Sequence, residues 1–364
     1  MKSLLEVLGF VACGAAIATL LSCGGGGSSS NNSSMSSPSS FTATTLVSDG
    51  AVSAPHTDPK LKNGWGVAFN PKGFVWVAGN GTNVATLYDG NGVPQSLVVT
   101  IPDGTHGEAA PTGIVFNDTQ SFTVTQNGKF GVAAFIFAGE GGSITAWAPA
   151  VGPTNAFTMY DDGTGGAVYK GLALAANNGN NFLYATDFHN NKIDVFDTNF
   201  TKVTMPGGFK DPAIPAGYAP FGIQLIGSNV FVTYAQQDAA KHDDVAGAGL
   251  GMVDVFDTAG NLKQHFATGT PLNAPWGIAQ APNNFGAFSG TILIGNFGDG
   301  TINAFDASSG QSMGPLNSSN AARSSSTACG ASHSATISTI SPPIRSSSQR
   351  ALTTKRTEST EESI

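Results

Sequence analysis

The chain is poor in charge. Only 11% of its 364 residues are Asp, Glu, Lys or Arg, and the formal net charge is −8. Because nucleic-acid binding requires clustered Lys and Arg, this balance argues against a nucleic-acid partner. No segment shows a sustained 3.6-residue apolar period, which argues against long helices.

Cysteine is also scarce, and its positions matter. Residues 7–21 are apolar but too short to cross a bilayer comfortably. The stretch that follows, Leu20-Leu21-Ser22-Cys23-Gly24, resembles the bacterial lipobox, in which signal peptidase cuts before a cysteine that becomes lipidated. Cys13 would then leave with the signal and Cys23 would carry lipid, so only Cys329 remains and no intramolecular disulfide is available. An ordinary secretory signal is the alternative.

We therefore expect residues 1–22 to be a lipoprotein signal peptide and residues 23–40, rich in Gly and Ser, to be a flexible tether. Gly24, where Asp would favour retention, suits sorting to the outer membrane. The expected product is an exported lipoprotein of the outer membrane or cell surface. Its expected partners are the membrane, through the Cys23 lipid, and an unidentified envelope ligand or protein. We expect a monomer.

Glycine, by contrast, is abundant, with 47 residues. A short x-G-[IVL] segment recurs about every fifty residues, with its glycine at Gly66, Gly113, Gly171, Gly222 and Gly277. Each copy is followed by two short apolar strand patterns that a polar turn separates. A period of this size with several strands predicts blades of antiparallel sheet. We expect an all-β, six-bladed β-propeller over residues 41–312, with about five blades evident.

Each unit ends in an aromatic-Asp turn pattern, as in Phe256-Asp257-Thr258-Ala259-Gly260. We predict that this Asp accepts hydrogen bonds from backbone amides two residues on, because Asp is a standard turn former. A ring of catalytic carboxylates is the alternative.

The last segment, residues 313–364, has a different composition. It is rich in Ser, Thr and Ala and holds all the arginines: Arg323, Arg345, Arg350 and Arg356. We expect a low-complexity, disordered tail that disrupts the sixth blade and leaves an open seam between the fifth and first units. We also raise the hypothesis that this tail is a frameshift product. A shifted reading frame can restore a Trp-Gly-Ile blade start across residues 329–331.

Several stretches carry a family resemblance. They are WGVAFNPKGFVWVAGNGTNVATLYDGNG, NFLYATDFHNNKIDVFD, DAAKHDDVAGAGLGMVDVFDTAGNL and GNFGDGTINAFD. Together they resemble an uncharacterised bacterial family of secreted six-bladed propellers, related to the NHL and SMP-30-like group, some members of which carry PEP-CTERM sorting tails. The resemblance implies a propeller fold and export, and it implies no activity.

In such blades the entry of the first strand and the exit of the second lie on one face, so residues there should line an axial funnel. Convergent polar groups around an apolar mouth are the default site hypothesis. We expect this ligand-binding face to contain Trp65, Asn80, Thr112, Glu140, Lys170, Asp187, His189, Phe221, Gln236, Asp238, Trp276 and Asn296.

A divalent metal, Ca²⁺ or another ion, is a further hypothesis. Asp187 and His189 form a carboxylate–imidazole pair, and residues 235–249 are the most charged stretch of the domain. The candidate ligands are Asp187, His189, Asp238, His242, Asp243 and Asp244. The alternative is that the pair shapes its turn and that the loop is solvated.

Two functions remain open. The first is a non-catalytic propeller of the cell envelope that binds a ligand or protein. The second is a metal-dependent hydrolase or lyase, lactonase-like, that acts on a small molecule in the funnel. Only analogy of fold supports the second function, and a fold does not determine a function.

Overall fold

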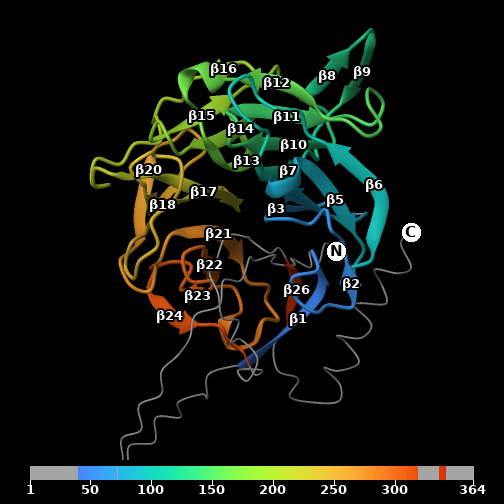
Figure 1. Cartoon of the computed structure of the whole chain (residues 1–364). Coiled ribbons are helices and arrows are strands. Elements are labelled where there is room, and N and C mark those ends of the chain that lie inside the picture. Colours follow the sequence, from blue (N-terminus) through green and yellow to red (C-terminus); the bar gives the residue numbers. More distant parts are fainter. Residues whose placement is uncertain (1–39, 72, 319–335, 342–364) are drawn as a thin grey trace, which may run out of the picture.

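The computed structural model describes residues 40–71, 73–318 and 336–341. Five four-stranded antiparallel sheets follow one another around a central axis, which defines an all-β propeller with five blades (Figure 1). Within these residues, helix is limited to three single 3₁₀ turns: η1 (Asn80–Thr82), η2 (Gly163–Gly165) and η3 (Gly286–Phe288). No helix in the described part of the chain is long and apolar enough to cross a membrane.

Each blade is a meander whose first strand is innermost. Blade one contains β3 (Gly64–Phe69), β4 (Val75–Gly79), β5 (Val84–Tyr88) and β6 (Pro94–Thr100). Blade two contains β7 (Pro111–Phe116), β10 (Phe135–Gly139), β11 (Ser143–Trp147) and β12 (Phe157–Asp161), and carries the inserted hairpin of β8 (Thr123–Gln126) and β9 (Lys129–Val132). Blade three contains β13 (Tyr169–Asn177), β14 (Asn180–Asp187), β15 (Lys192–Phe196) and β16 (Lys202–Val203).

The last two blades follow the same plan. Blade four contains β17 (Tyr218–Ile226), β18 (Asn229–Gln236), β19 (Met252–Phe256) and β20 (Leu262–Thr268). Blade five contains β21 (Pro275–Gln280), β22 (Ile292–Asn296), β23 (Ile302–Phe305) and β24 (Ser312–Pro315).

The repeated glycine lies where neighbouring inner strands approach most closely. A Cβ atom added at Gly113 of β7 would lie 2.5 Å from the backbone nitrogen of Leu172 in β13. At Gly222 of β17 it would collide with the backbone carbonyl of Trp276 in β21. The x-G-[IVL] pattern therefore marks the contact between one blade and the next, where no side chain fits.

The hydrophobic core lies between adjacent blades. Trp76 of blade one stacks on Phe135 of blade two, with ring centroids 4.0 Å apart, and also contacts Trp147 at 5.0 Å. Each of these rings is buried. Burial of aromatic area between blades stabilises the propeller.

The Asp at the end of units one, three, four and five forms a turn, as predicted, whereas unit two has Ala148 at this position. Oδ1 of Asp257 accepts the amides of Ala259 and Asn261, both at 2.9 Å, and Asp197 and Asp306 accept amides in the same way. These carboxylates are committed to their turns and do not form a ring at the axis.

A sixth sheet lies between blade five and blade one. It contains β1 (Ser40–Ser48), β2 (His56–Thr57), β25 (Asn317–Ser318) and β26 (Thr336–Ser341). β1 pairs in parallel with β2 and β25 and antiparallel with β26, so this sheet is not a meander like the five blades. Phe41 packs against Phe285 and Phe288 of unit five, and Val47 clusters with Leu61 and Val77 beside blade one.

The structure corrects two expectations about this region. The expected propeller boundary at residue 312 falls at the start of β24, which pairs with β23 and completes blade five. The expected open seam is bridged by β1, and Thr336–Ser341 of the expected disordered tail forms a strand against it. Sheet pairing of a Thr- and Ile-containing segment overrides its low-complexity composition. Most of the tail, including Cys329 and the segment of the frameshift hypothesis, lies outside the described residues, as do Cys23 and the tether.

Candidate functional site on the axial face

The centre of the site is Lys170, at the start of β13. Its side chain is only 1% exposed, and Nζ forms ion pairs with Glu140 and, at 3.3 Å, with Asp243. Nζ also lies 5.2 Å from the ring centroid of Trp65. Glu140 directly follows β10, so strand entry and strand exit do meet on one face. The two carboxylates and the face of the Trp65 ring together offset the cost of burying the Lys170 ammonium.

Two asparagines extend this polar network toward blade one. Nδ2 of Asn80, in η1, donates to Oε2 of Glu140 at 2.9 Å, and Nδ2 of Asn63 donates to Oδ1 of Asn80 at 2.9 Å. Asn80 also donates to the backbone carbonyl of Ala110 at 3.1 Å. The second oxygen of Glu140 is therefore held by blade one, and the carboxylate has little freedom to rotate.

The long loop between β18 and β19 folds back over Lys170. Oδ1 of Asp238 accepts the amides of His242 at 2.9 Å and Asp243 at 3.3 Å, and the Asp238 amide donates to the Asp243 carbonyl at 2.8 Å. The carboxylate of Asp238 thus shapes the loop. The loop presents His242 and Asp243, whose side chains are 47% and 68% exposed.

His242 and Asp243 form a charge-assisted pair. Nδ1 of His242 lies 3.1 Å from Oδ1 of Asp243. This contact raises the pKa of His242 above its ordinary value. The same hydrogen bond, together with the charge of Lys170, lowers the pKa of Asp243 well below its ordinary range. Asp243 therefore remains an anion across the physiological pH range.

Beneath the charged groups lies an aromatic layer. The Trp65 ring meets the rings of Phe221 at 6.1 Å and Trp276 at 5.4 Å, both edge to face, and Phe297 at 4.9 Å. Nε1 of Trp276 donates to the backbone carbonyl of Lys170 at 2.9 Å. The layer closes the axis under the Lys170 cluster and joins unit one to unit five.

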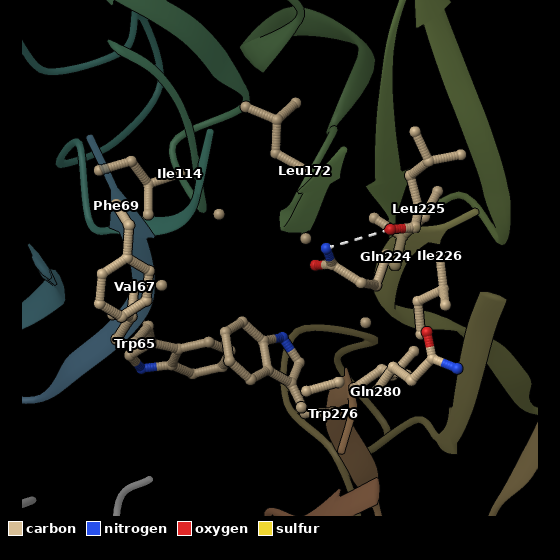
Figure 2. Close-up of a pocket in the computed structure, with 18 of the residues that line it drawn as sticks. Trp65, Val67, Phe69, Ile114, Leu172, Gln224, Leu225, Ile226, Trp276 and Gln280 are labelled. Carbon is tan, nitrogen blue, oxygen red and sulfur yellow. Dashed lines mark hydrogen bonds between the residues drawn. The ribbon is translucent and has the colours of Figure 1, made fainter. Parts of the chain in front are cut away.

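A cavity of about 310 Å³ lies below this layer, along the inner strands. Figure 2 shows Trp65 and Trp276 side by side at one edge, with Val67, Ile114 and Leu172 among the apolar side chains around the space. Gln224 and Gln280 are exposed members of the lining. The cavity lining therefore combines apolar side chains with polar groups, the two glutamines among them. Trp65 and Trp276 belong to this lining, whereas Lys170 does not.

Part of the predicted funnel set comes together at one place. The funnel residues that contact one another directly or through Lys170 are Trp65, Asn80, Glu140, Lys170, Phe221 and Trp276. Asp243 and His242, which were predicted only as metal ligands, join them. Their meeting follows from the blade geometry that the repeat predicted.

Other predicted residues hold the scaffold. Oγ1 of Thr112 is buried and donates to the Tyr169 carbonyl at 2.7 Å, which clips blade two to blade three. Asn296 is buried and donates to the Pro271 carbonyl at 2.8 Å. Gln236, at the end of β18, accepts the Val245 amide through its backbone at the base of the loop, and Asp244 forms a backbone bridge to Gln237 there.

Asp187 and His189 do not share a metal-ligating position. Asp187 is fully buried, and its carboxylate accepts the amides of Val168 and Asn190 at 3.2 Å and pairs with Lys192 at 3.2 Å. The half-buried His189 has its ring beside Gly166. Asp187 thus shapes the turn, which was the simpler of the two interpretations.

Among the described residues, two groups bring three metal-ligand atoms within 4.8 Å of one another. One is Glu140, His242 and Asp243, and the other is Asp211, Asp254 and His265. In the first group, Nζ of Lys170 already pairs with both carboxylates, so an added cation would meet a like charge. Three features were not predicted from the sequence: Asn63, the second group, and Phe188, whose ring centroid lies 6.0 Å from Nζ of Lys170. Comparing aligned third strands of successive blades would have found Asp254.

The comparisons with known proteins show which family the chain belongs to. No known protein-family profile matches the chain. The chain is 34% identical over 302 residues to an uncharacterised protein of Acanthamoeba polyphaga mimivirus, covering 81% of this chain and 74% of that protein. A second uncharacterised mimivirus protein is 33% identical, covering 74% of this chain and 72% of its own length. The chain belongs to the family of these proteins. These relatives are viral proteins, so they do not support the expected bacterial origin.

Solved propellers resemble the chain weakly. The nidogen/laminin complex structure aligns with a TM-score of 0.44 and 15% identity, over 71% of this chain and 81% of that one. A streptogramin B lyase has a TM-score of 0.39 and 15% identity, over 74% and 85%. A gluconolactonase from Xanthomonas campestris has a TM-score of 0.40 and 14% identity, over 64% and 65%. Their activities belong to those proteins.

Proposed function

We propose that the chain is a non-catalytic binding propeller whose ligand docks on the axial face above Lys170. The observation that supports this most is the rigid, charge-compensated cluster of Lys170, Glu140 and Asp243, which comes from three different blades. Preorganised polar groups on rigid elements favour recognition, since little ordering is left to occur on binding.

The exposed polar groups of this face indicate which kind of ligand it would bind. Asp243 stays ionised and is 68% exposed, while its buried partner Lys170 is inaccessible to solvent. A group that donates N–H or O–H bonds, such as a basic peptide side chain or a glycan hydroxyl, fits this acceptor. We propose a protein or glycan ligand of this kind.

We also propose export and lipid anchoring. The lipobox-like Leu20-Leu21-Ser22-Cys23 segment and the Gly/Ser-rich tether support an envelope location in a bacterial cell. The tether would hold the propeller at a distance from the membrane. In a Gram-negative host, radiolabelled palmitate should be incorporated into the chain and lost in Cys23→Ser. Equal labelling of both, or none, would contradict the anchor.

The binding proposal is tested with arrays of peptides and glycans probed by the full-length protein. We expect retained probes to share amino or hydroxyl donors, and Asp243→Asn to weaken their binding by at least about ten-fold, since a charge-assisted hydrogen bond is worth about 2 kcal/mol. The control is Lys129→Ser, on the β9 hairpin of blade two. Binding that is indifferent to Asp243→Asn would disprove the assignment of this face.

The alternative is a metal-dependent hydrolase or lyase, lactonase-like, that uses Glu140, His242 and Asp243 as ligands. Their ligand atoms lie within 4.8 Å of one another, which favours it. Lys170 between the two carboxylates disfavours it, because its charge occupies the position a metal would take. Lactone hydrolysis that needs Ca²⁺, Zn²⁺ or Mn²⁺ and disappears in His242→Ala would establish the enzyme instead.

A further inference from the structure

One buried position recurs in the third strand of every blade. It lies two residues before the aromatic that ends the strand, and the strand pairing places it in the same register each time. The five occupants are Thr86, Thr145, Asp194, Asp254 and Asn303, and every one is buried. Three of them are neutral, so a carboxylate is not required by the fold at this position.

In blade three the carboxylate is neutralised by lysines. Asp194 pairs with Lys192 at 2.9 Å and with Lys202 at 2.8 Å, and it accepts the hydroxyl of Tyr169 at 3.0 Å. Lys192 also pairs with Asp187 at 3.2 Å, and Lys202 also pairs with Asp162 at 3.1 Å. In blade three, two cations and a phenol thus compensate a group of three carboxylates.

Blade four keeps the carboxylate but has replaced both lysines. The register equivalents of Lys192 and Lys202 are Met252 and Leu262. A second carboxylate has been added by Asp211, from the connection between β16 and β17. That connection is fixed by the amide of Phe209, which donates to the Gly260 carbonyl at 3.1 Å.

The resulting group carries more negative than positive charge. Among the described residues, the ion pairs of Asp211 and Asp254 are both with His265, whose Nδ1 lies 3.0 Å and 3.3 Å from their oxygens. His265 is 61% exposed, while the two carboxylates are 2% and 3% exposed. Even a protonated His265 balances only one of the two charges.

One oxygen in this group, Oδ2 of Asp254, is buried and has neither a hydrogen bond of good geometry nor an ion pair in the described part of the chain. Oδ2 of Asp211 is also buried, and its ion-pair contact is Nδ1 of His265 at 3.0 Å. A buried carboxylate oxygen without a partner is costly, so a further cation at this group would stabilise it.

We propose that Asp211, Asp254 and His265 bind one divalent cation of the Zn²⁺ or Mn²⁺ type. Two carboxylates and an imidazole are ligands such ions accept. Ligand atoms about 2.0–2.2 Å from a tetrahedral ion lie roughly 3.3 Å apart, close to the separations from His265 Nδ1. The ion would stand in for the two lysines of blade three and fasten the β16–β17 connection to β19 and β20.

This site is independent of the axial face and of the proposed ligand. The axial group has Lys170 between its carboxylates, whereas the group in blade four has no lysine partner among the described residues. The two groups therefore make opposite predictions for the same metal titration.

The test uses full-length protein, stripped with EDTA, titrated with Zn²⁺ alone and in parallel with Mn²⁺ alone by calorimetry and thermal unfolding. We expect one ion per chain and a higher unfolding temperature. His265→Ala should weaken binding by at least about ten-fold, since even outer partners of a metal ligand contribute that much. Because the His265 side chain is 61% exposed, this variant should remain folded. His242→Ala should bind as the wild type does.

A second variant separates a metal ligand from a structural carboxylate. Asn already occupies the equivalent position in blade five, so Asp254→Asn fits the fold. We expect it to leave the metal-free protein at least as stable as wild type and to abolish stabilisation by Zn²⁺. The matched control, Asp194→Asn, should destabilise blade three whether or not Zn²⁺ is added. The proposal is overturned if neither ion binds, if His265→Ala leaves the affinity unchanged, or if His242→Ala abolishes binding.

Discussion

Lys170 shows how one residue can organise a face of the molecule. Its ammonium is removed from water and depends on Glu140 and Asp243 for compensation, while its backbone carbonyl accepts the indole of Trp276. Removing one member of a buried ion pair usually costs more than removing both, because the remaining charge stays buried and unpaired.

A double-mutant cycle measures this dependence. Lys170→Met should lower the free energy of unfolding by about 3 kcal/mol, since it leaves Glu140 without its cation. Adding Glu140→Gln, which keeps an acceptor for Asn80, should restore a large part of that loss. Urea unfolding of the four proteins gives the coupling energy. Strictly additive losses would mean that the pair is not energetically coupled.

His242 gives a prediction about pH. Its pKa is raised by Asp243, so the pair stabilises the folded state below the ordinary histidine pKa and loses that contribution as pH rises through the raised value. Since the pKa of Asp243 is lowered, the contribution is also lost in acid. A histidine NMR titration should show His242 above about 6.5 in the wild type and lower in Asp243→Asn. An unchanged titration would refute the pairing.

For single residues, the sequence predicted which side chains lie in the funnel better than it predicted their chemical roles. The repeat placed Trp65, Glu140 and Lys170 at blade ends, and the fold brought them into contact. The sequence could not show that the Asp187 carboxylate accepts hydrogen bonds within its own turn. Asp-rich turns and metal sites have the same local composition.

At the scale of single elements, the inner strands are constrained by the glycine they share. Gly113→Ala should destabilise the protein by about 3 kcal/mol or more, because its Cβ would lie 2.5 Å from the Leu172 nitrogen, and backbone cannot move aside cheaply. The control is Gly90→Ala, in a turn where a Cβ meets nothing within 4 Å. Thermal or urea unfolding should separate the two variants, and equal stabilities would disprove the close-contact explanation.

Strands and turns followed from the sequence pattern, whereas strand partners did not. Alternating apolar residues and Asp turns marked most blade strands. The pairing of Asp254 with His265 and the approach of Asp211 depend on register and on a packed connection. Register is a property of two strands together, so one-strand patterns cannot reveal such a cluster.

At the scale of the whole molecule, the seam between blades five and one depends on the sheet around β1. A chain that ends after Ser318 lacks β26 and exposes an edge of β1. It should unfold at a lower temperature and aggregate more readily, because an unpaired edge recruits other chains. A chain that ends after Ser341 keeps β26 and serves as control. Equal unfolding temperatures and equal light scattering would contradict a role for β26.

The tryptophan layer divides the axis into two compartments. Trp65 lines the 310 Å³ cavity and also lies under Lys170 on the axial face. A molecule that enters the cavity from the Gln224 and Gln280 end thus reaches a dead end at Trp65 and Trp276. The propeller is accordingly not a conduit, and occupants of its two ends should bind at the same time without displacing each other.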